Sequence, residues 1–203
     1  MSYSIIGSGN IGSALARQFA RKGISVAIAN QRGPDSLQLL KKELGEDIVP
    51  QTIEAALTVN TVILAVPHTA VSAIARRSRD WKGKIVVDAT NAIDFPSYAS
   101  TDLGGRLSSE LVTDQLRGAR VVKAFNTIGA VLFGDSDFDM FYCGDDEEAK
   151  YAVRGLIGDT TMSPVDAGPL KNARYLEQIA GLWVDLAVKG RIPGSFGFKL
   201  MRK

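Results

Sequence analysis

Short β-branched segments alternate with longer amphipathic segments over the first 124 residues of the sequence. The strand-like runs are YSII, SVAIA, TVILAV, KIVVDAT and RVVKAF. Helical patterns cover about residues 11–22 and 35–43, and they recur in TAVSAIARR and LSSELVTDQL. Strands that are apolar on both faces and separated by amphipathic helices are typical of a parallel sheet covered on both sides. We therefore predict an α/β domain with a doubly wound parallel sheet over residues 1–124.

The remaining residues, 125–203, are predicted to form a small C-terminal α+β cap. A segment rich in Gly and Asp, FNTIGAVLFGDSDF, leads into a strand at DMFYCG and a helix over about residues 147–157. A last helix is predicted over about residues 170–188, before the Gly-rich tail GRIPGSFGFKLMRK. Its apolar residues occupy more than one stripe. We expect this helix to lie between the cap and the sheet, or between the subunits of a homodimer.

Composition and charge exclude several classes of protein. The 203 residues are 45% hydrophobic with a net charge of +2, and the Lys and Arg residues are scattered, so we expect no nucleic-acid surface. The single Cys143 has no partner for a disulfide and no neighbours at metal-ligand spacing, and we expect no metal site. No secretion signal and no apolar run of about 20 residues is present, which predicts a soluble, cytoplasmic protein without a membrane partner.

Three glycines directly follow the first predicted strand at the spacing of a dinucleotide-binding loop. Gly7, Gly9 and Gly12 form the motif GxGxxG, and a helical pattern begins within it. In such loops the first glycine permits the tight turn, the second lets the backbone approach a pyrophosphate, and the third lets the helix pack against the strand. The pyrophosphate then lies at the helix N-terminus, where free N–H groups and the helix dipole favour an anion. The motif in this context predicts a Rossmann-type dinucleotide site.

The end of the second predicted strand selects between the two nicotinamide dinucleotides. NAD sites usually carry an Asp or Glu here that binds the ribose hydroxyls. In this chain SVAIA is followed by Asn30, Gln31 and Arg32, with no acid among them. An arginine can instead pair with the 2′-phosphate of NADP through charge-assisted hydrogen bonds. We therefore predict that NADP(H) binds, with Asn30 and Arg32 at its 2′-phosphate.

The carboxyl ends of the later strands are expected to line the same crevice. Ala65, Val66 and Pro67 are small or rigid enough for a ribose and a nicotinamide to lie on the backbone, and Asn91 can bond either group. His68 is the sole histidine of the sequence, and both a general-acid role and a structural role at a helix start stay open for it. No triad, paired acids or metal cluster stands out, and we assign no catalytic side chain.

These motifs together resemble the NADPH-dependent reductases of the deazaflavin coenzyme F420. The resemblance rests on GSGNIG at residues 7–12, NQR at 30–32, VILAVP at 62–67, VVKAFNTIGA at 121–130 and DAGPLKNARYLE at 166–177. It extends over essentially the whole chain, because the tail GSFGFKLM is also similar. The segment VVKAFNT is similar as well to the cytosolic reductase domain of the six-transmembrane metalloreductases, which passes hydride from NADPH to a flavin.

The resemblance implies a hydride transfer between NADP(H) and a small-molecule redox acceptor, F420 or a flavin, bound in the cleft between the two domains. The implied contacts to the cofactor are Ser8, Asn10 and Ile11 at the pyrophosphate, Asn30 and Arg32 at the 2′-phosphate, and Ala65, Pro67 and Asn91 at the nicotinamide half. The residues implied where the two rings meet are Asn126, Thr127, Ile128 and Ala130. Those implied to close the acceptor pocket from the tail are Gly194, Phe196 and Gly197.

Two departures from the family leave the acceptor open. The F420 enzymes that we compare have a His at the position of Asn126 and a Pro at that of Gly129, whereas an Asn matches the flavin-using relatives. The residues alone also allow Asn126 as a turn residue, and they place Trp183 and Phe196 in the core or at an interface. Two alternative functions stay open: a non-catalytic NADP(H)-binding sensor, and a small-molecule dehydrogenase or imine reductase of the β-hydroxyacid type.

Overall fold

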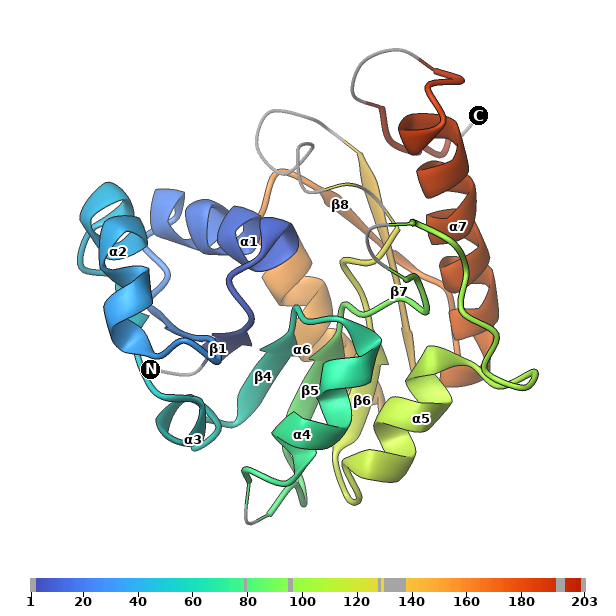
Figure 1. Ribbon diagram of the computed structural model, residues 1–203. Coiled ribbons are helices and arrows are strands. Elements are labelled where there is room, and N and C mark those ends of the chain that lie inside the picture. The colour runs from blue at the N-terminus through green and yellow to red at the C-terminus, as the bar shows by residue number, and fades with distance from the viewer. Residues whose placement is uncertain are drawn as a thin grey trace.

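A single mixed sheet organises the molecule. The computed structural model describes residues 3–78, 80–94, 97–127, 129, 138–192 and 196–201. The strands of the sheet follow the order β3-β2-β1-β4-β5-β6-β7-β8 (Figure 1). Their bounds are β1 Tyr3–Ile6, β2 Val26–Ala29, β3 Ile48–Pro50, β4 Thr61–Leu64, β5 Ile85–Asp88, β6 Arg120–Lys123, β7 Asp139–Gly144 and β8 Ser163–Asp166. The predicted doubly wound α/β fold is confirmed.

The first six strands are parallel and have the order found in dinucleotide-binding domains. The chain reverses direction across the sheet between β1 and β4, which are neighbours. Their last residues lie in one row with those of the next strands, so that Ile6, Leu64, Asp88 and Lys123 mark a common edge. In open α/β sheets ligands bind outside this carboxyl edge, beside the point of reversal.

Helices cover both faces of the sheet and bury apolar side chains against it. On one face of the sheet a single hydrophobic core extends from end to end. Helix α1 (Asn10–Arg21) contributes Leu15 and Phe19 to this core, and α6 (Glu147–Gly158) contributes Val153. The opposite face is covered by α3 (Ile53–Ala56), α4 (Val71–Ala75) and α5 (Ser108–Gln115). Figure 1 shows α7 (Ala173–Val188) standing beside β7, at the other end of the sheet from α2 (Gln38–Leu44).

Several predicted boundaries differ from the structure for local reasons. The helix predicted over residues 35–43 is a 3-10 turn, Pro34–Leu37, followed by α2, and the last helix begins with a 3-10 turn at Leu170–Asn172. The short strand β3 was not predicted, because its three residues give no alternation to detect.

None of the helices among the described residues is long and apolar enough to cross a membrane.

The residues after 124 extend the sheet of the nucleotide half. Strand β7 runs antiparallel to β6, and β8 runs parallel to β7. The division into a unit of residues 1–124 and a cap of residues 125–203 therefore stays a prediction about folding units. The described residues cover only part of helix α7. Ala173, Leu176 and Ala180 are buried, whereas Leu182 and Val188 are half exposed.

Candidate functional site

The loop between β1 and α1 requires glycine at two of its three motif positions. Gly7 has φ +112°, and a Cβ there would lie 2.1 Å from the carbonyl oxygen of Ala65. A Cβ on Gly12 would lie 2.0 Å from the carbonyl oxygen of Gly7, so no larger residue fits where the helix crosses the turn. An added Cβ on Gly9 would meet no atom within 4 Å. Gly9 thus faces open space, as an approach of the backbone to a ligand requires.

The N-terminus of α1 is open to an anion. The helix begins at Asn10 after Gly9, no side chain caps its first turn, and no acidic residue lies there. The first N–H groups of a helix have no partner within the helix, and the dipole gives this end a partial positive charge. A 12-residue helix with such an end fits the pyrophosphate of a dinucleotide.

A cavity of about 360 Å³ lies on one side of this helix end. Its wall includes Gly7, Ser8, Gly9, Asn30, Gln31, Arg32, Ala65, Val66 and Pro67. The described residues that line it include no Asp or Glu. The structure therefore brings the predicted 2′-phosphate residues together with Ala65, Val66 and Pro67, which were predicted to lie along the ribose and nicotinamide.

Asn30 fixes the rim of this smaller cavity. Its amide nitrogen donates to the hydroxyl oxygens of Ser8, at 2.8 Å, and Ser36, at 3.0 Å. Its amide oxygen accepts the backbone N–H of Arg32 at 2.9 Å. These bonds tie the end of β2 to the glycine loop and present Arg32 on the exposed rim. The side chain of Arg32 has no hydrogen-bond or ion-pair partner among the described residues, and its guanidinium is free to meet a phosphate.

A larger cavity, about 780 Å³, lies between α1 and α7. Ser8 and Gly9 border both cavities, so the two meet at the open N-terminus of α1. The other lining residues are Asn10, Ile11, Ser13, Ala14, Arg17, Asn91, Ile93, Tyr98, Asn126, Thr127, Gly129, Ala180, Trp183, Val184 and Val188. The volume lies within the range of sites that hold a drug-sized ligand. Trp183 was expected in the core or at an interface, and the structure places it in this wall.

Two asparagines from different strand ends hold each other at the floor of the larger cavity. The amide nitrogen of Asn91 donates to the backbone carbonyl of Asn126 at 3.0 Å. The amide nitrogen of Asn126 donates to the amide oxygen of Asn91, at 3.0 Å, and to the carbonyl of Leu176, at 3.2 Å. Because the Leu176 carbonyl only accepts, the amide nitrogen of Asn126 must face it.

The amide oxygen of Asn126 is consequently left without a partner. The residue is 4% exposed, and this oxygen is buried with no hydrogen bond among the described residues. A buried, unpaired acceptor costs about 1–3 kcal/mol, which a ligand donor would recover. Phe125, just before it, is held at φ +61°, a backbone conformation that bulky residues rarely adopt and that is often found at functional sites.

A buried ammonium group lies behind the two asparagines and was not singled out in the sequence. Lys123, at the end of β6, is fully buried and pairs with the buried carboxylate of Asp88 at 3.0 Å. Its ammonium also donates to the carbonyl of Thr90 at 2.7 Å and to the hydroxyl of Ser108 at 3.0 Å. Glu177 of α7 lies 3.4 Å from it. A lysine inside an otherwise apolar strand was the available signal, because such a charge needs buried partners.

Glu177 joins α7 to the beginning of α5. Its carboxylate accepts from the hydroxyl of Ser108 at 2.8 Å and from the backbone N–H groups of Ser108, at 3.2 Å, and Ser109, at 3.3 Å. Ser109 also donates to Asp88 at 2.8 Å. A carboxylate at a helix N-terminus is favourable for the helix dipole. The network fixes α7, one wall of the larger cavity, to the strand ends that form its floor.

The remaining predicted acceptor residues lie in different surroundings. Thr127 is buried in the wall of the larger cavity. Phe196 packs behind Trp183, with ring centroids 5.7 Å apart. Gly197 packs on the ring of Phe138, where a Cβ would lie 2.7 Å from the nearest ring carbon. Ile128, Ala130 and Gly194 lie outside the described residues.

His68 lies outside both cavities as described. It begins a 3-10 turn, His68–Ala70, directly after Pro67, which does line the smaller cavity. Its Nδ1 is buried without a hydrogen-bond partner among the described residues. The structure assigns no catalytic role to this histidine, and its position agrees with the structural role at a helix start.

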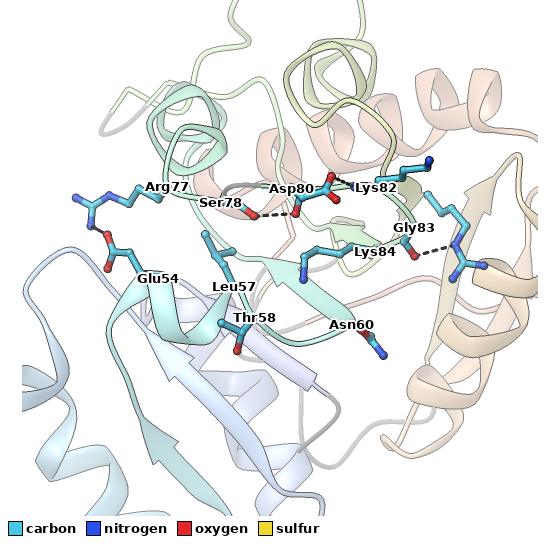
Figure 2. A pocket seen from close by; sticks show the side chains of 11 residues that line it. Glu54, Leu57, Thr58, Asn60, Arg77, Ser78, Asp80, Lys82, Gly83 and Lys84 are labelled. Atoms are coloured by element: carbon cyan, nitrogen blue, oxygen red, sulfur yellow. Dashed lines mark hydrogen bonds and ion pairs between the residues drawn. The ribbon is translucent and has the colours of Figure 1, made fainter.

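A third cavity, about 730 Å³, lies at the opposite edge of the sheet, where β4, β5 and β6 begin. Figure 2 shows Arg77 and Glu54 facing one another at this cavity, where they pair at 3.0 Å. Lys84 donates to the carbonyl of Val59 at 2.8 Å, and Arg120 pairs with Glu148 at 3.2 Å. Because Arg77, Lys84 and Arg120 already have partners, these three cations offer an anion little, and the cavity lies away from the ligand edge of a parallel sheet.

The reactivity of the Cys143 thiol on β7 shows whether this side chain is buried. The side chain is fully buried, and this burial raises the pKa of its thiol to about 12. At pH 8 a thiolate fraction on the order of 10⁻⁴ follows, and the thiolate is the reactive form. We expect no measurable reaction with an aromatic disulfide reagent in the native protein, and one thiol per chain after unfolding in urea. Release of one equivalent within minutes from the native protein would contradict this.

Comparison with known proteins finds relatives over most of the chain. The sequence profile of a family described as NADP oxidoreductase, coenzyme F420-dependent, matches residues 2–92. The F420-dependent NADP reductase of Methanothermobacter marburgensis is 30% identical over 205 residues, which cover 92% of each chain. The metalloreductase STEAP3 of Rattus norvegicus is 28% identical over 179 residues, which cover 86% of this chain and 35% of that protein. The crystal structure of a hypothetical protein from Sinorhizobium meliloti is 44% identical, covering 84% of this chain and 86% of that one, with a TM-score of 0.79.

Proposed function

Because the chain belongs to the family of F420-dependent NADP oxidoreductases, we propose that it transfers a hydride between NADP(H) and a deazaflavin or flavin acceptor. The observation that carries the proposal is the meeting of the two cavities at Ser8 and Gly9, above the open N-terminus of α1. A dinucleotide bound across this point has its adenosine half in the smaller cavity and its nicotinamide in the larger one. In this arrangement Ala65, Val66 and Pro67 lie beside the adenosine half, which replaces the sequence-based prediction that they lie at the nicotinamide half. The larger cavity then has room for a second ring.

The fit of NADP(H) rests on charge and on space. The uncapped helix end accepts the pyrophosphate, and the open face of Gly9 lets it come close. Arg32 on the rim of the smaller cavity pairs with the 2′-phosphate, and the wall carries no acid to repel it among the described residues. Asn91 and Asn126 supply the polar groups at the floor of the larger cavity.

The chemistry requires little of the side chains beyond orientation. When bound, NADPH supplies a hydride that passes with its electron pair to the acceptor ring, and the reduced acceptor takes one proton from water. The protein contributes proximity and alignment of two rings and exclusion of water between them. The apolar wall formed by Ile11, Ala180 and Val184 serves that exclusion. This role explains why we assign no acid or base.

We propose a class of acceptor and not a single compound. Each competing function predicts a different result with NADP(H). The relatives named for F420 support a deazaflavin, and the similarity to a metalloreductase supports a flavin. A sensor would bind NADP(H) without turnover, and a dehydrogenase would reduce small carbonyl compounds or imines.

We also propose a homodimer, because the half-exposed Leu182 and Val188 are side chains that an interface would cover.

The proposed function predicts oxidation of NADPH in the presence of a ring acceptor. The purified protein is given NADPH, and the absorbance of the reduced nicotinamide is followed while F420, FMN, FAD and a ferric chelate are supplied in turn. We expect turnover with F420 or a flavin and a slower reaction with NADH. Binding of NADPH without turnover across the set would reject the proposal and favour the sensor, and reduction of imines alone would favour the dehydrogenase.

Gly9→Ala tests whether NADPH binds at the glycine loop. A Cβ at residue 9 meets no protein atom within 4 Å, so the variant should fold like the wild type. It nevertheless occupies space that the pyrophosphate needs. We expect the melting temperature to be unchanged and NADPH to bind roughly 10-fold or more weakly, since several helix N–H bonds to the phosphate are lengthened. Unaltered NADPH binding would show that the dinucleotide lies elsewhere.

A further inference from the structure

Trp183 is held by Phe196 within the wall of the larger cavity. Its indole nitrogen donates to the backbone carbonyl of Phe196 at 2.8 Å. Its ring packs against the ring of Phe196, with an angle of 30° between the planes. The residue itself is partly exposed and lines the cavity together with Ala180 and Val184, its neighbours on α7. The remaining surface of the indole faces the space that a ligand would fill.

Gly129 makes this position of the indole possible. A Cβ on residue 129 would lie 2.2 Å from Cη2 and 2.4 Å from Cζ2 of Trp183. These distances leave no room for any side chain, so the indole packs directly on the backbone of Gly129. A residue with a Cβ at 129 would force the ring of Trp183 away, because Phe196 occupies the space behind it.

The fixed indole offers an apolar surface and no free hydrogen bond. Its N–H is already used, so Trp183 can contribute to binding only through its ring. Aromatic rings attract planar ring systems in offset-stacked or edge-to-face arrangements. A side chain that is already immobilised loses little conformational freedom when a ligand binds. Trp183, Ala180 and Val184 form an apolar part of the wall, whereas polar side chains line the cavity at Asn91 and Asn126 on its floor and elsewhere at Ser8, Asn10, Ser13, Arg17, Tyr98 and Thr127.

We propose that Trp183 is the residue against which the planar ring of the redox acceptor packs, and that Gly129 keeps it in place. This inference rests on the proposed function and makes it more specific. It assigns the preference for a large, flat, aromatic acceptor to one side chain of α7, whereas the phosphates of the cofactor are held by the glycine loop and Arg32. Trp183 is thus a specificity-determining residue, and it takes no part in the transfer of the hydride.

The first test separates acceptor binding from cofactor binding in the kinetics. Trp183→Leu and Trp183→Phe are assayed with NADPH and FMN, and in parallel with F420. We expect the KM for the acceptor to rise roughly 10-fold in Trp183→Leu and less in Trp183→Phe, since one ring–ring contact is lost. The dissociation constant for NADPH should stay within about 2-fold. Gly129→Ala should also raise the acceptor KM, because it displaces the indole.

Trp81→Phe is the matched control, because the protein has two tryptophans and this one does not line the larger cavity. Trp81 is 5% exposed in the core on the α4 and α5 face, and its indole nitrogen donates to the carbonyl of Ala75 at 3.0 Å. We expect its kinetic constants to equal those of the wild type. Circular dichroism spectra and melting temperatures of all variants exclude unfolding as the cause of a raised KM.

Tryptophan fluorescence provides a readout that needs no turnover. With NADP⁺ present and no reductant, FMN or F420 is titrated into the wild type, Trp81→Phe and Trp183→Phe. A ring packed on Trp183 should quench the emission of the wild type and of Trp81→Phe, and leave that of Trp183→Phe nearly constant. Equal quenching in all three proteins would overturn the proposal.

The outcomes for the two proposals are distinguishable. Turnover of the wild type with an unchanged acceptor KM in Trp183→Leu would overturn the role of Trp183 and leave the proposed function standing. Quenching that depends on Trp183, in a protein that never oxidises NADPH, would support the ring site and reject the hydride transfer. The absence of both turnover and quenching with either acceptor would reject the two together.

Discussion

Replacing Lys123 with Met is expected to lower the free energy of unfolding by about 3–5 kcal/mol. The ammonium of Lys123 and the carboxylate of Asp88 are both fully buried and lie 3.0 Å apart. Glu177 lies 3.4 Å from the same ammonium. Removing the ammonium therefore leaves two carboxylates close together without a cation. Breaking a buried pair on one side is costly because the remaining carboxylate loses its cation where water cannot replace it, and the hydrogen bonds that Asp88 keeps from Thr90 and Ser109 supply no full positive charge. For a chain of this length the melting temperature should fall by roughly 10 °C.

Two further variants show whether the charge itself is responsible. Lys41→Met removes an ion pair at the surface, where Lys41 lies 2.9 Å from Glu46, and should cost less than about 1 kcal/mol. Asp88→Asn in the Lys123→Met protein removes one uncompensated carboxylate and should recover part of the lost stability. Urea unfolding of the three proteins measures these differences. A loss below 1 kcal/mol in Lys123→Met would mean that the network contributes little.

The position of this network links stability to the site. Lys123 holds the carbonyl of Thr90, and the next residue, Asn91, holds Asn126. Glu177 attaches α7 to the same group of charges. The floor and one wall of the larger cavity are therefore fixed by a single set of buried bonds. A site that aligns two rings without an acid or base depends on such rigidity, because orientation is what it contributes.

The nucleotide half of the site could be predicted from the sequence because its signals are local. Gly7, Gly9 and Gly12 lie within one turn and its helix, and their spacing reflects contacts over a few residues. The residues after β2 are likewise read directly, and the structure places Asn30 and Arg32 on the rim of the smaller cavity. The parallel sheet follows from the alternation of strands and helices, whereas the order of its strands comes from the structure.

The acceptor half could be predicted only in part because its contacts join distant segments. The pairing of Asn91 with Asn126, and that of Lys123 with Glu177, depends on how strand ends and α7 meet in space. Helical periodicity placed Trp183 on an apolar stripe, but it does not distinguish a core from the wall of a cavity. The structure makes that distinction, since the indole lines a space of about 780 Å³.

Arg32→Ala is expected to weaken the binding of NADPH by roughly 10- to 100-fold and to leave the binding of NADH unchanged. The reason is that the guanidinium makes charge-assisted hydrogen bonds to the 2′-phosphate, worth about 1.5–3 kcal/mol each, and NADH has no such group. Dissociation constants from calorimetry or nicotinamide fluorescence measure the change. In the wild type the affinity for NADPH should also fall more steeply with salt than that for NADH.

Arg76→Ala is the matched control for this prediction. Arg76 is also an exposed arginine, but its guanidinium donates to Ser72 at 2.7 Å and it borders neither site cavity. Its removal lowers the net charge equally, so any general electrostatic effect on a phosphate ligand appears in both variants. A loss confined to Arg32→Ala assigns the recognition of the 2′-phosphate to that residue. Equal affinity of the wild type for NADPH and NADH would contradict it, because the rim of the smaller cavity would then not distinguish the two dinucleotides.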